Sequence, residues 1–287
     1  MVIIISTIVI ALIIVFSIYV YKESTEYHTV TYSFSDKRLL KDKVKIVFLT
    51  DLHNKQYGEK NCRVYDDIVK INPDYVMIGG DMITSCMEKW SDYSDTLEFV
   101  KNLSQKFKVI YGMGNHEERL RRRPEKFPEG TYEDLTARLK ANGTPILVNE
   151  CVHLDDGIDV YGIDLDHEYF RKVITRPIPD TYIEGKLGRP NPQKFSILLA
   201  HNPEHFESYA KWGANLVLSG HVHGGIIRLP FLGGVVSPAL KLFPKYDGGH
   251  FKEYGSDMVL GRGLGSHTVP IRINNKAEIV VVELNKE

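Results

Sequence analysis

Three short apolar runs alternate with two segments of helical spacing in the first half of the chain, and this alternation limits the possible folds most strongly. The runs KVKIVFLT (43–50), DYVMIGG (74–80) and FKVIYGMG (107–114) have the length and the β-branched content of buried strands. Between them, CRVYDDIVKI (62–71) and DTLEFVKNLSQ (95–105) carry apolar residues at helical spacing. This order predicts a parallel sheet covered by helices, which is an α/β fold.

The rest of the chain continues this pattern less regularly. The further elements that we expect are a helix at 131–142, strands near 146–154 and 157–163, and buried strands at 195–200 and 214–219 with a short helix near 203–211 between them. The C-terminal part is expected to form strands and turns. The stretch 164–194 is long, polar and contains four prolines, so we expect a surface excursion over one edge of the sheet.

The N-terminus holds nineteen consecutive uncharged and mostly apolar residues at positions 2–20. This length crosses the hydrocarbon core of a bilayer as a helix. A core helix rarely needs apolar residues on every face. A cleaved signal peptide would show a basic segment before the run and a small-x-small cleavage site after it, and neither is present. We therefore expect residues 1–21 to form an uncleaved single-pass anchor that places the protein at the cell membrane.

The side of the membrane on which the remaining chain lies stays open. Lys22, Lys37 and Arg38 follow the apolar run and no basic residue precedes it, which favours a cytoplasmic domain by the positive-inside rule. We expect residues 22–43 to be a juxtamembrane segment and lead-in, and residues 44–287 to form one globular domain. The net charge of −1 offers no bulk attraction to nucleic acid, so no nucleic-acid partner is expected.

Polar residues stand at the end of each of five apolar runs. They are Asp51 and His53 after the first run, Asp81 after the second, Asn115, His116 and Glu117 after the third, His201 after the fourth, and His221 and His223 after the fifth. The carboxyl ends of parallel strands meet at one edge of a sheet, where ligands bind. Residues i and i+2 of an extended segment face the same way, so each of the two i, i+2 pairs can point at one centre.

These residue types indicate a metal site. Carboxylate, imidazole and amide groups bind hard-to-borderline divalent metals, and the three cysteines show no CxxC spacing for a thiolate site. Taken singly, an aspartate after a strand is most often a turn residue and a lone histidine is most often hydrogen-bonded in the core or at the surface. Seven candidate ligands exceed the coordination of one ion and suit two ions that share a carboxylate. Gly220, Gly224 and Gly225 let the backbone turn close to such a centre.

The order D-x-H, G-G-D, G-N-H-E, an isolated H and G-H-x-H resembles that of the calcineurin-like metallophosphoesterase superfamily. The resemblance runs from about residue 44 to the C-terminus. The stretches GHVHGGIIRLPFLG, GGHF and RGLGSHTVPIRINNKAEIVVVEL are similar to the bacterial branch that includes membrane-tethered and exported phosphodiesterases of the YkuE and YaeI kind. The resemblance implies a four-layer metallophosphoesterase sandwich, in which two mixed β-sheets pack face to face and helices flank them.

The resemblance also implies two divalent metal ions (Mn, Zn or Fe) bridged by Asp81. One ion is expected at Asp51, His53, Asp81 and His223, and the other at Asp81, Asn115, His201 and His221. His116 binds no metal in this scheme and is expected to be the general acid. Many relatives carry an aspartate after this histidine, whereas here Glu117 follows it, so the group that orients the His116 ring stays open. Asp164 receives no role.

The implied activity is that of a phosphodiesterase or pyrophosphatase acting near the membrane. A metal-bridging hydroxide attacks phosphorus in line and His116 protonates the leaving group. A lipid or cell-envelope phosphoester would suit the anchor. The alternatives are a phosphomonoesterase and a catalytically inactive scaffold, and the scaffold is disfavoured because every matched position is filled. Asn54, Lys55, Arg119 and Arg121–Arg123 could add phosphate contacts, although Arg121–Arg123 are more simply a solvated basic run.

Overall fold

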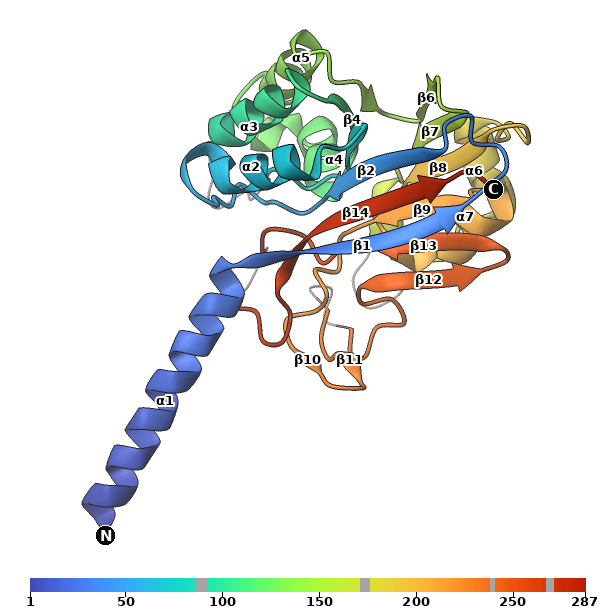
Figure 1. Ribbon diagram of the computed structural model, residues 1–287. Coiled ribbons are helices and arrows are strands. Elements are labelled where there is room, and N and C mark those ends of the chain that lie inside the picture. Colours follow the sequence, from blue (N-terminus) through green and yellow to red (C-terminus); the bar gives the residue numbers. More distant parts are fainter. Residues whose placement is uncertain (86–91, 171–175, 238–240, 267–270) are drawn as a thin grey trace.

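The chain forms two six-stranded sheets, flanked by helices, and one long N-terminal helix that extends away from them (Figure 1). The computed structural model describes residues 1–85, 92–170, 176–237, 241–266 and 271–287. The helices are α1 (Val2–Thr25), α2 (Cys62–Ile71), α3 (Ser94–Ser104), α4 (Asn115–Arg122), α5 (Thr131–Ala141), α6 (Asp180–Leu187) and α7 (Phe206–Trp212).

Both large sheets are mixed. The strand order of the first sheet is β1 (Tyr27–Ser35), β14 (Ala277–Asn285), β2 (Lys43–Leu49), β3 (Tyr75–Ile78), β4 (Lys108–Gly112) and β5 (Ile146–Leu147). The order of the second is β12 (Gly249–Glu253), β13 (Ser256–Leu260), β9 (Leu216–Ser219), β8 (Phe195–Leu199), β7 (Ile158–Gly162) and β6 (Glu150–Leu154). A separate antiparallel hairpin consists of β10 (Arg228–Leu229) and β11 (Gly233–Gly234).

Strand β2 shows why the sequence folds into four layers. Its side chains alternate between two apolar cores, because successive residues of a strand face opposite sides. Val47 and Leu49 pack with residues of α2, α3 and α5 on the outer face of the first sheet. Ile46 and Phe48 belong to the core that also contains residues of β7, β8 and β9, between the two sheets. A third core joins the outer face of the second sheet to α6 and α7.

The predicted strand–helix alternation is confirmed. Strands β2, β3 and β4 pair in parallel, and α2 and α3 connect them. Strands β7, β8 and β9 form a second parallel set, so the two-sheet arrangement implied by the family resemblance is also confirmed. The sheets are mixed rather than parallel throughout, because β14 runs antiparallel to β2 and because β6 and β12 run antiparallel to their neighbours.

Two segments differ from their sequence-based descriptions. The stretch 22–43, expected to be a lead-in, contains β1, which pairs in parallel with the whole of β14 at the edge of the first sheet. The stretch 164–194 is more than a surface excursion, since it contains α6, and Tyr169 and Ile183 are buried in the third core. The apolar residues of this stretch pack against the outer face of the second sheet.

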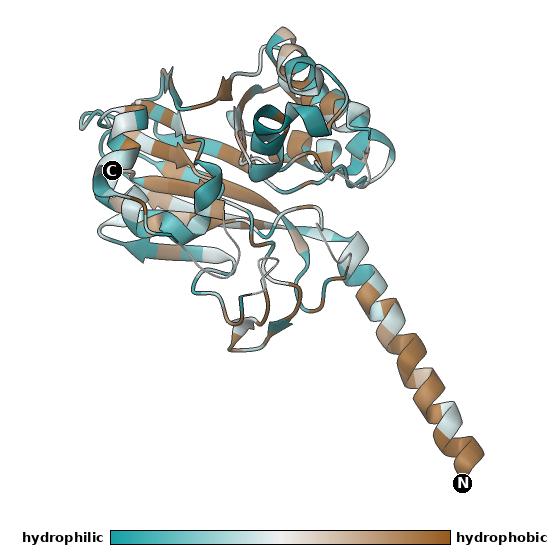
Figure 2. Ribbon diagram, turned by 180° about the vertical axis from the view of Figure 1, so that it is seen from behind, coloured by the Kyte–Doolittle hydropathy of each residue, from teal (hydrophilic) through white to brown (hydrophobic). Residues whose placement is uncertain are grey.

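Helix α1 lies outside every core. Its large apolar side chains are exposed, and it is hydrophobic along most of its length (Figure 2). It is long and apolar enough to cross a membrane, with a mean hydropathy of 3.0 over its most apolar window and none of that window buried. The alternative that this run is a core helix of the globular part is therefore wrong.

Candidate metal centre

The predicted site residues come together at the carboxyl ends of strands from both sheets. Asp51 and His53 follow β2, Asp81 follows β3, Asn115 and His116 begin α4 directly after β4, His201 follows β8, and His221 and His223 follow β9. All of them except His221 are buried. Buried carboxylates and imidazoles need partners of opposite charge or a metal, so this concentration of them indicates a functional centre.

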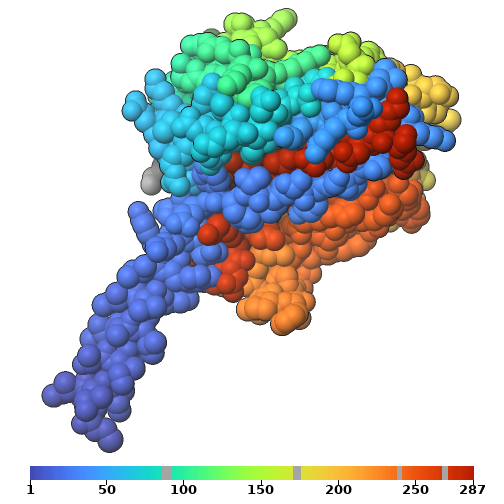
Figure 3. Space-filling model, in the orientation of Figure 1, coloured from blue at the N-terminus to red at the C-terminus, as the bar shows by residue number. Residues whose placement is uncertain are grey.

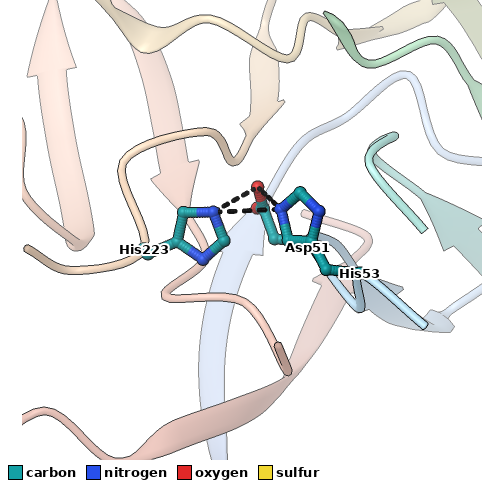
Figure 4. A group of neighbouring side chains, drawn as sticks. All are labelled: Asp51, His53 and His223. Carbon is teal, nitrogen blue, oxygen red and sulfur yellow. Dashed lines mark hydrogen bonds and ion pairs between the residues drawn. The ribbon is translucent and has the colours of Figure 1, made fainter. Parts of the chain in front are cut away.

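Asp51, His53 and His223 form one group of potential metal ligands (Figure 4). The Nε2 atoms of His53 and His223 lie 3.2 Å apart. Asp51 Oδ1 lies 3.3 Å from Nε2 of His223 and 3.8 Å from Nε2 of His53. Three donor atoms therefore converge on one point from the ends of β2 and β9.

Asp81, His201 and His221 form a second group. Asp81 Oδ2 lies 3.1 Å from His201 Nε2, and the rings of His201 and His221 are 5.2 Å apart. The same Oδ2 atom is 3.9 Å from His53 Nε2, which belongs to the first group. Asp81 thus lies between the two groups, and the two histidines of the H-x-H motif fall into different groups.

The backbone at these positions is strained. Asp51, His53, Asp81, His221 and His223 have φ values of 52°, 50°, 53°, 74° and 52°, in the left-handed region that non-glycine residues rarely adopt. The expectation that each i, i+2 pair lies on extended backbone is therefore wrong. Such strain costs of order 1–3 kcal/mol per residue and gathers at functional sites, where the surrounding structure maintains it.

Gly220 allows the second sheet to approach the first. A Cβ atom at this position would lie 2.1 Å from Thr50 Oγ1 and 2.3 Å from Asp51 Oδ2. The close approach also lets the backbone N–H of His221 donate to the Asp51 carboxylate at 3.1 Å. A larger residue at Gly220 would push the two halves of the centre apart.

Backbone carbonyl groups orient two of the imidazoles. The Nδ1 atom of His201 lies 2.7 Å from the Gly79 carbonyl oxygen, and that of His223 lies 3.2 Å from the carbonyl oxygen of Gly265. A carbonyl oxygen can only accept, so each Nδ1 carries a proton and each Nε2 is the atom that faces the centre. This arrangement is the usual one for a metal-binding histidine.

The centre stabilises positive charge between its carboxylates. Burial works against a charged His201, but Asp81, Asp51 and the Gly79 carbonyl outweigh it and raise the pKa of His201 to about 10. Burial and the neighbouring His201 lower the pKa of His221 to about 4. The carboxylates thus favour a positive charge at this point, as a site for a divalent metal ion would.

Asn115 supports the same conclusion. Its Oδ1 atom is buried and accepts no hydrogen bond from the described residues. An unpaired buried acceptor costs free energy unless a cation or a water fills its place. Together with the carboxylate and imidazole donors, this amide oxygen fits a divalent metal.

His116 is held by Ser85 and not by Glu117, which answers the question left open by the sequence. The backbone N–H of Ser85 donates to His116 Nδ1 at 2.7 Å, and Ser85 Oγ lies 3.1 Å from the same atom. An N–H group can only donate, so Nδ1 is an acceptor and the ring proton is on Nε2. This Nε2 atom lies 4.0 Å from Asp81 Oδ2, on the side of the centre.

Glu117 instead holds the G-G-D turn. Its carboxylate accepts hydrogen bonds from the backbone N–H groups of Asp81 at 2.9 Å, Met82 at 3.1 Å and Gly114 at 3.1 Å, and from the hydroxyl of Tyr111 at 2.7 Å. Burial and the Asp81 carboxylate raise the pKa of Glu117 to about 7, whereas these donors favour its ionised form. The side chain fixes the backbone of the residue shared by the two groups.

Glu117→Gln is expected to weaken both the fold and the metal centre. The carboxamide carries an NH₂ in place of one oxygen, so at least one backbone N–H would face another donor. We expect a loss of about 2–3 kcal/mol in the free energy of unfolding, measured by denaturation in detergent micelles. Metal affinity should fall about 10–100-fold, measured by calorimetry, because the turn that carries Asp81 loses its support.

The control is Glu125→Gln, which changes an exposed carboxylate a short distance along the same segment. Its stability should stay within about 0.5 kcal/mol of the wild type. A Glu117→Gln protein with unchanged stability and metal affinity would show that the four hydrogen bonds do not support Asp81.

The other basic candidates have partners within the protein. Lys55 donates to the Ser24 carbonyl at the end of α1, and Arg119 donates to the Ser85 carbonyl at 2.7 Å. Arg121 pairs with Asp164, which gives that aspartate a structural partner. The run Arg121–Arg123, expected to be solvated, therefore contains at least one residue that forms an ion pair with a distant segment of the chain.

Sequence reasoning missed two residues of the C-terminal segment. Asn275 donates through Nδ2 to the His223 carbonyl at 2.8 Å, and Arg272 donates to the Gly265 carbonyl at 2.6 Å. Arg272 is buried although its side chain is long and charged. The only available signal was the clustering of three polar residues in the stretch IRINN, just before the apolar run of β14.

A buried cluster of aspartate, histidine and asparagine at the strand ends of two facing mixed sheets defines a metal-dependent α/β protein. Residues 44–225 match the sequence profile of the calcineurin-like phosphoesterase family. The chain belongs to this family.

Similar proteins come from several bacteria. The chain is 31% identical to an uncharacterized metallophosphoesterase of Helicobacter pylori over 85% of its own length and 60% of the relative. It is 29% identical to the uncharacterized metallophosphoesterase YkuE of Bacillus subtilis, covering 85% of this chain and 79% of YkuE. It is 27% identical to the phosphodiesterase YaeI of Escherichia coli, covering 84% and 82%. The chain thus spans about 60% of the length of the Helicobacter relatives.

Proposed function

We propose that the protein is a metal-dependent phosphodiesterase whose site holds two divalent cations. The observation that supports this proposal best is that Asp81 belongs to two groups of potential ligands, one with His53 and His116 and one with His201 and His221. The family and the relative named as a phosphodiesterase agree with it.

The proposed ligand sets follow the two groups. Asp51, His53, His223 and Asp81 would hold one cation, and Asp81, His201, His221 and Asn115 the other. When bound, the two cations supply Lewis-acid stabilisation of phosphoryl charge and a water molecule of lowered pKa.

His116 is the group that we propose as the proton donor. His116 also lies within ligand distance of His53 and Asp81, but the proposed scheme assigns it no metal, and its Nε2 atom lies 4.0 Å from Asp81 Oδ2. We propose that the proton on Nε2 is donated to the leaving oxygen of the phosphodiester. In the structure the Ser85 N–H makes Nδ1 an acceptor, so the ring must gain a second proton before it can donate one from Nε2 and return to its neutral form.

A phosphomonoesterase, a pyrophosphatase and an inactive scaffold are the other candidates. The scaffold has least support, because every proposed ligand and His116 lie at the centre. We also propose that α1 anchors the protein in the cell membrane and that the natural substrate is a phosphodiester of the membrane or the cell envelope. This localisation rests on the length, the apolar character and the exposure of α1.

The proposed activity is tested with the full chain in detergent and a panel of phosphoesters, each assayed with Mn²⁺, Zn²⁺ or Fe²⁺. Bis(4-nitrophenyl) phosphate should be hydrolysed, chelation should abolish the activity and the metal should restore it. Preference for 4-nitrophenyl phosphate by more than about tenfold would indicate a monoesterase. A protein that binds metal and hydrolyses no member of the panel would instead be a scaffold.

A further inference from the structure

Exposed apolar side chains outside α1 gather in one place. Within the described part of the chain after α1, eight large apolar residues are exposed, and five of them lie between positions 229 and 243. We call these five the apolar tip: Leu229, Phe231, Leu232, Leu242 and Phe243. Single exposed apolar residues are common, but a contiguous group of them marks an interaction site.

The turn at the apolar tip has an unusual composition. The loop between β10 and β11 is Pro-Phe-Leu, and Phe231 is fully exposed at a φ of 67°. Gly, Asn or Asp is preferred at such a position of a hairpin loop in water. Leu242 and Phe243 lie beside the chain that continues from β11, because Leu242 forms an antiparallel β-bridge with Val236. The hairpin loop therefore presents an aromatic side chain where a small polar residue is preferred in water.

The base of this hairpin is joined to the end of α1 by hydrogen bonds through the segment 271–275. Arg228, at the start of β10, donates through its backbone to the Ile273 carbonyl at 3.0 Å. The next residue, Asn274, accepts a bond from the Tyr19 hydroxyl of α1 at 2.6 Å. Asn275 donates its backbone N–H to Glu23 of α1 at 3.1 Å. The last turns of α1 and the hairpin base are therefore parts of one connected unit.

The hairpin and α1 project from the same side of the molecule. Figures 1 and 2 show β10 and β11 below the two sheets, on the side on which α1 leaves the domain. The space-filling view shows the hairpin as a protrusion beside the upper part of α1 (Figure 3). A bilayer crossed by α1 therefore has its surface near the apolar tip.

The same unit reaches the metal centre. The hairpin follows the motif that contains His223, and Asn275 holds the His223 carbonyl at 2.8 Å. Arg272 donates its backbone N–H to Ser24 Oγ of α1 at 3.1 Å, and its guanidinium to the carbonyl of Gly265, which lies against His223 Nδ1. Chains of hydrogen bonds with only one or two intervening residues thus connect His223, a proposed ligand, to α1.

We propose that the apolar tip is inserted in the interfacial layer of the bilayer that α1 crosses, and that it holds the metal centre at the membrane surface, where the substrate is a phosphodiester in a lipid headgroup. This rests on the proposed phosphodiesterase function and on the proposed anchor. Apolar and aromatic side chains enter this layer readily. A second copy of the chain fits the tip less well, since a stable interface uses about 20–30 residues a side.

The position of the tip is tested by tryptophan fluorescence. The full chain is reconstituted in vesicles of phosphatidylethanolamine and phosphatidylglycerol, with or without brominated acyl chains that quench tryptophan on contact. Phe231→Trp should add fluorescence that brominated lipid quenches, relative to the wild-type protein. Val9→Trp in α1 is the positive control. Tyr254→Trp is the matched negative control, because Tyr254 is also exposed at a positive φ, in the turn between β12 and β13.

Quenching at position 9 together with its absence at 231 overturns the proposal, and this is also the result that contact with a second copy would give. Absence of quenching at position 9 shows that α1 is not inserted, and it overturns the proposal as well. Quenching at 231 and 9 but not at 254 supports it.

The role of the tip in substrate choice is tested with two substrates that share a leaving group. One is a phospholipid with a 4-nitrophenyl phosphodiester headgroup, presented in the same vesicles, and the other is soluble bis(4-nitrophenyl) phosphate. Replacing both Phe231 and Leu232 with Ser should lower kcat/KM on the lipid about tenfold or more, because the centre loses its alignment with the surface. Activity on the soluble diester should change less than about twofold. Tyr254→Ser should affect neither.

Equal losses on both substrates, with metal content unchanged, would show that the tip supports the fold and does not contact lipid, which overturns the proposal. If the wild-type protein hydrolyses neither substrate, the phosphodiesterase function fails, while the fluorescence result still decides where the tip lies.

Discussion

Asp81→Asn is expected to abolish tight binding of both metal ions and to lower kcat/KM at least about 10³-fold, since each lost cation removes several kcal/mol of charge stabilisation. The carboxamide has nearly the shape of the carboxylate and keeps an oxygen for the His116 backbone N–H, which Asp81 Oδ1 accepts at 2.8 Å. The loss would therefore come from the charge shared between the two groups. Metal stoichiometry is measured by native mass spectrometry.

Asp51→Asn is the matched control, because Asp51 belongs to the first group alone and its Oδ1 lies 3.3 Å from His223 Nε2, compared with 3.8 Å from His201 Nε2 of the second group. We expect this variant to keep one tightly bound ion. An Asp81→Asn protein that retains two ions would contradict the bridging role. Loss of both ions in both variants would instead show that the two sites do not fill independently.

His116→Ala is expected to lose about 10²–10⁴-fold in kcat/KM on an alkyl phosphodiester and much less on a nitrophenyl one. An alkoxide leaves only with a proton, whereas a nitrophenolate leaves readily without one. Metal content should be unchanged, because His116 has no ligand role in the proposed centre. Both rate constants and the metal content are measured for the wild type and the variant.

Ser85→Ala separates the two contacts of the His116 ring. It removes the hydroxyl 3.1 Å from Nδ1 but keeps the backbone N–H that donates at 2.7 Å. The loss in kcat/KM should be much smaller than in His116→Ala if the backbone group sets the tautomer.

Equal losses of His116→Ala on the two substrates would mean that the ring stabilises phosphoryl charge and does not transfer a proton. Loss of a metal ion would make His116 a ligand.

Much of the fold could be predicted from local patterns. The apolar runs that became β2, β3, β4, β8 and β9 are buried on both faces, so their composition alone marks them as strands. Polar residues at their ends could then be placed at one edge, because parallel strands align their carboxyl ends. Strand β1 lies in the segment expected to be a lead-in, although TVTYSFS alternates polar and apolar residues. The family resemblance begins only at about residue 44, and the partner of β1 is β14, about 250 residues away.

The sequence by itself determined which residue types reach the centre and in what order, because strand ends and motif spacing are local properties. Only the tertiary structure decided that Ser85 holds His116 and that Glu117 supports Asp81. It also decided that a hairpin far from α1 in sequence lies beside it. These contacts join segments separated by up to about 250 residues, and their geometry depends on how two sheets pack, which no local pattern encodes.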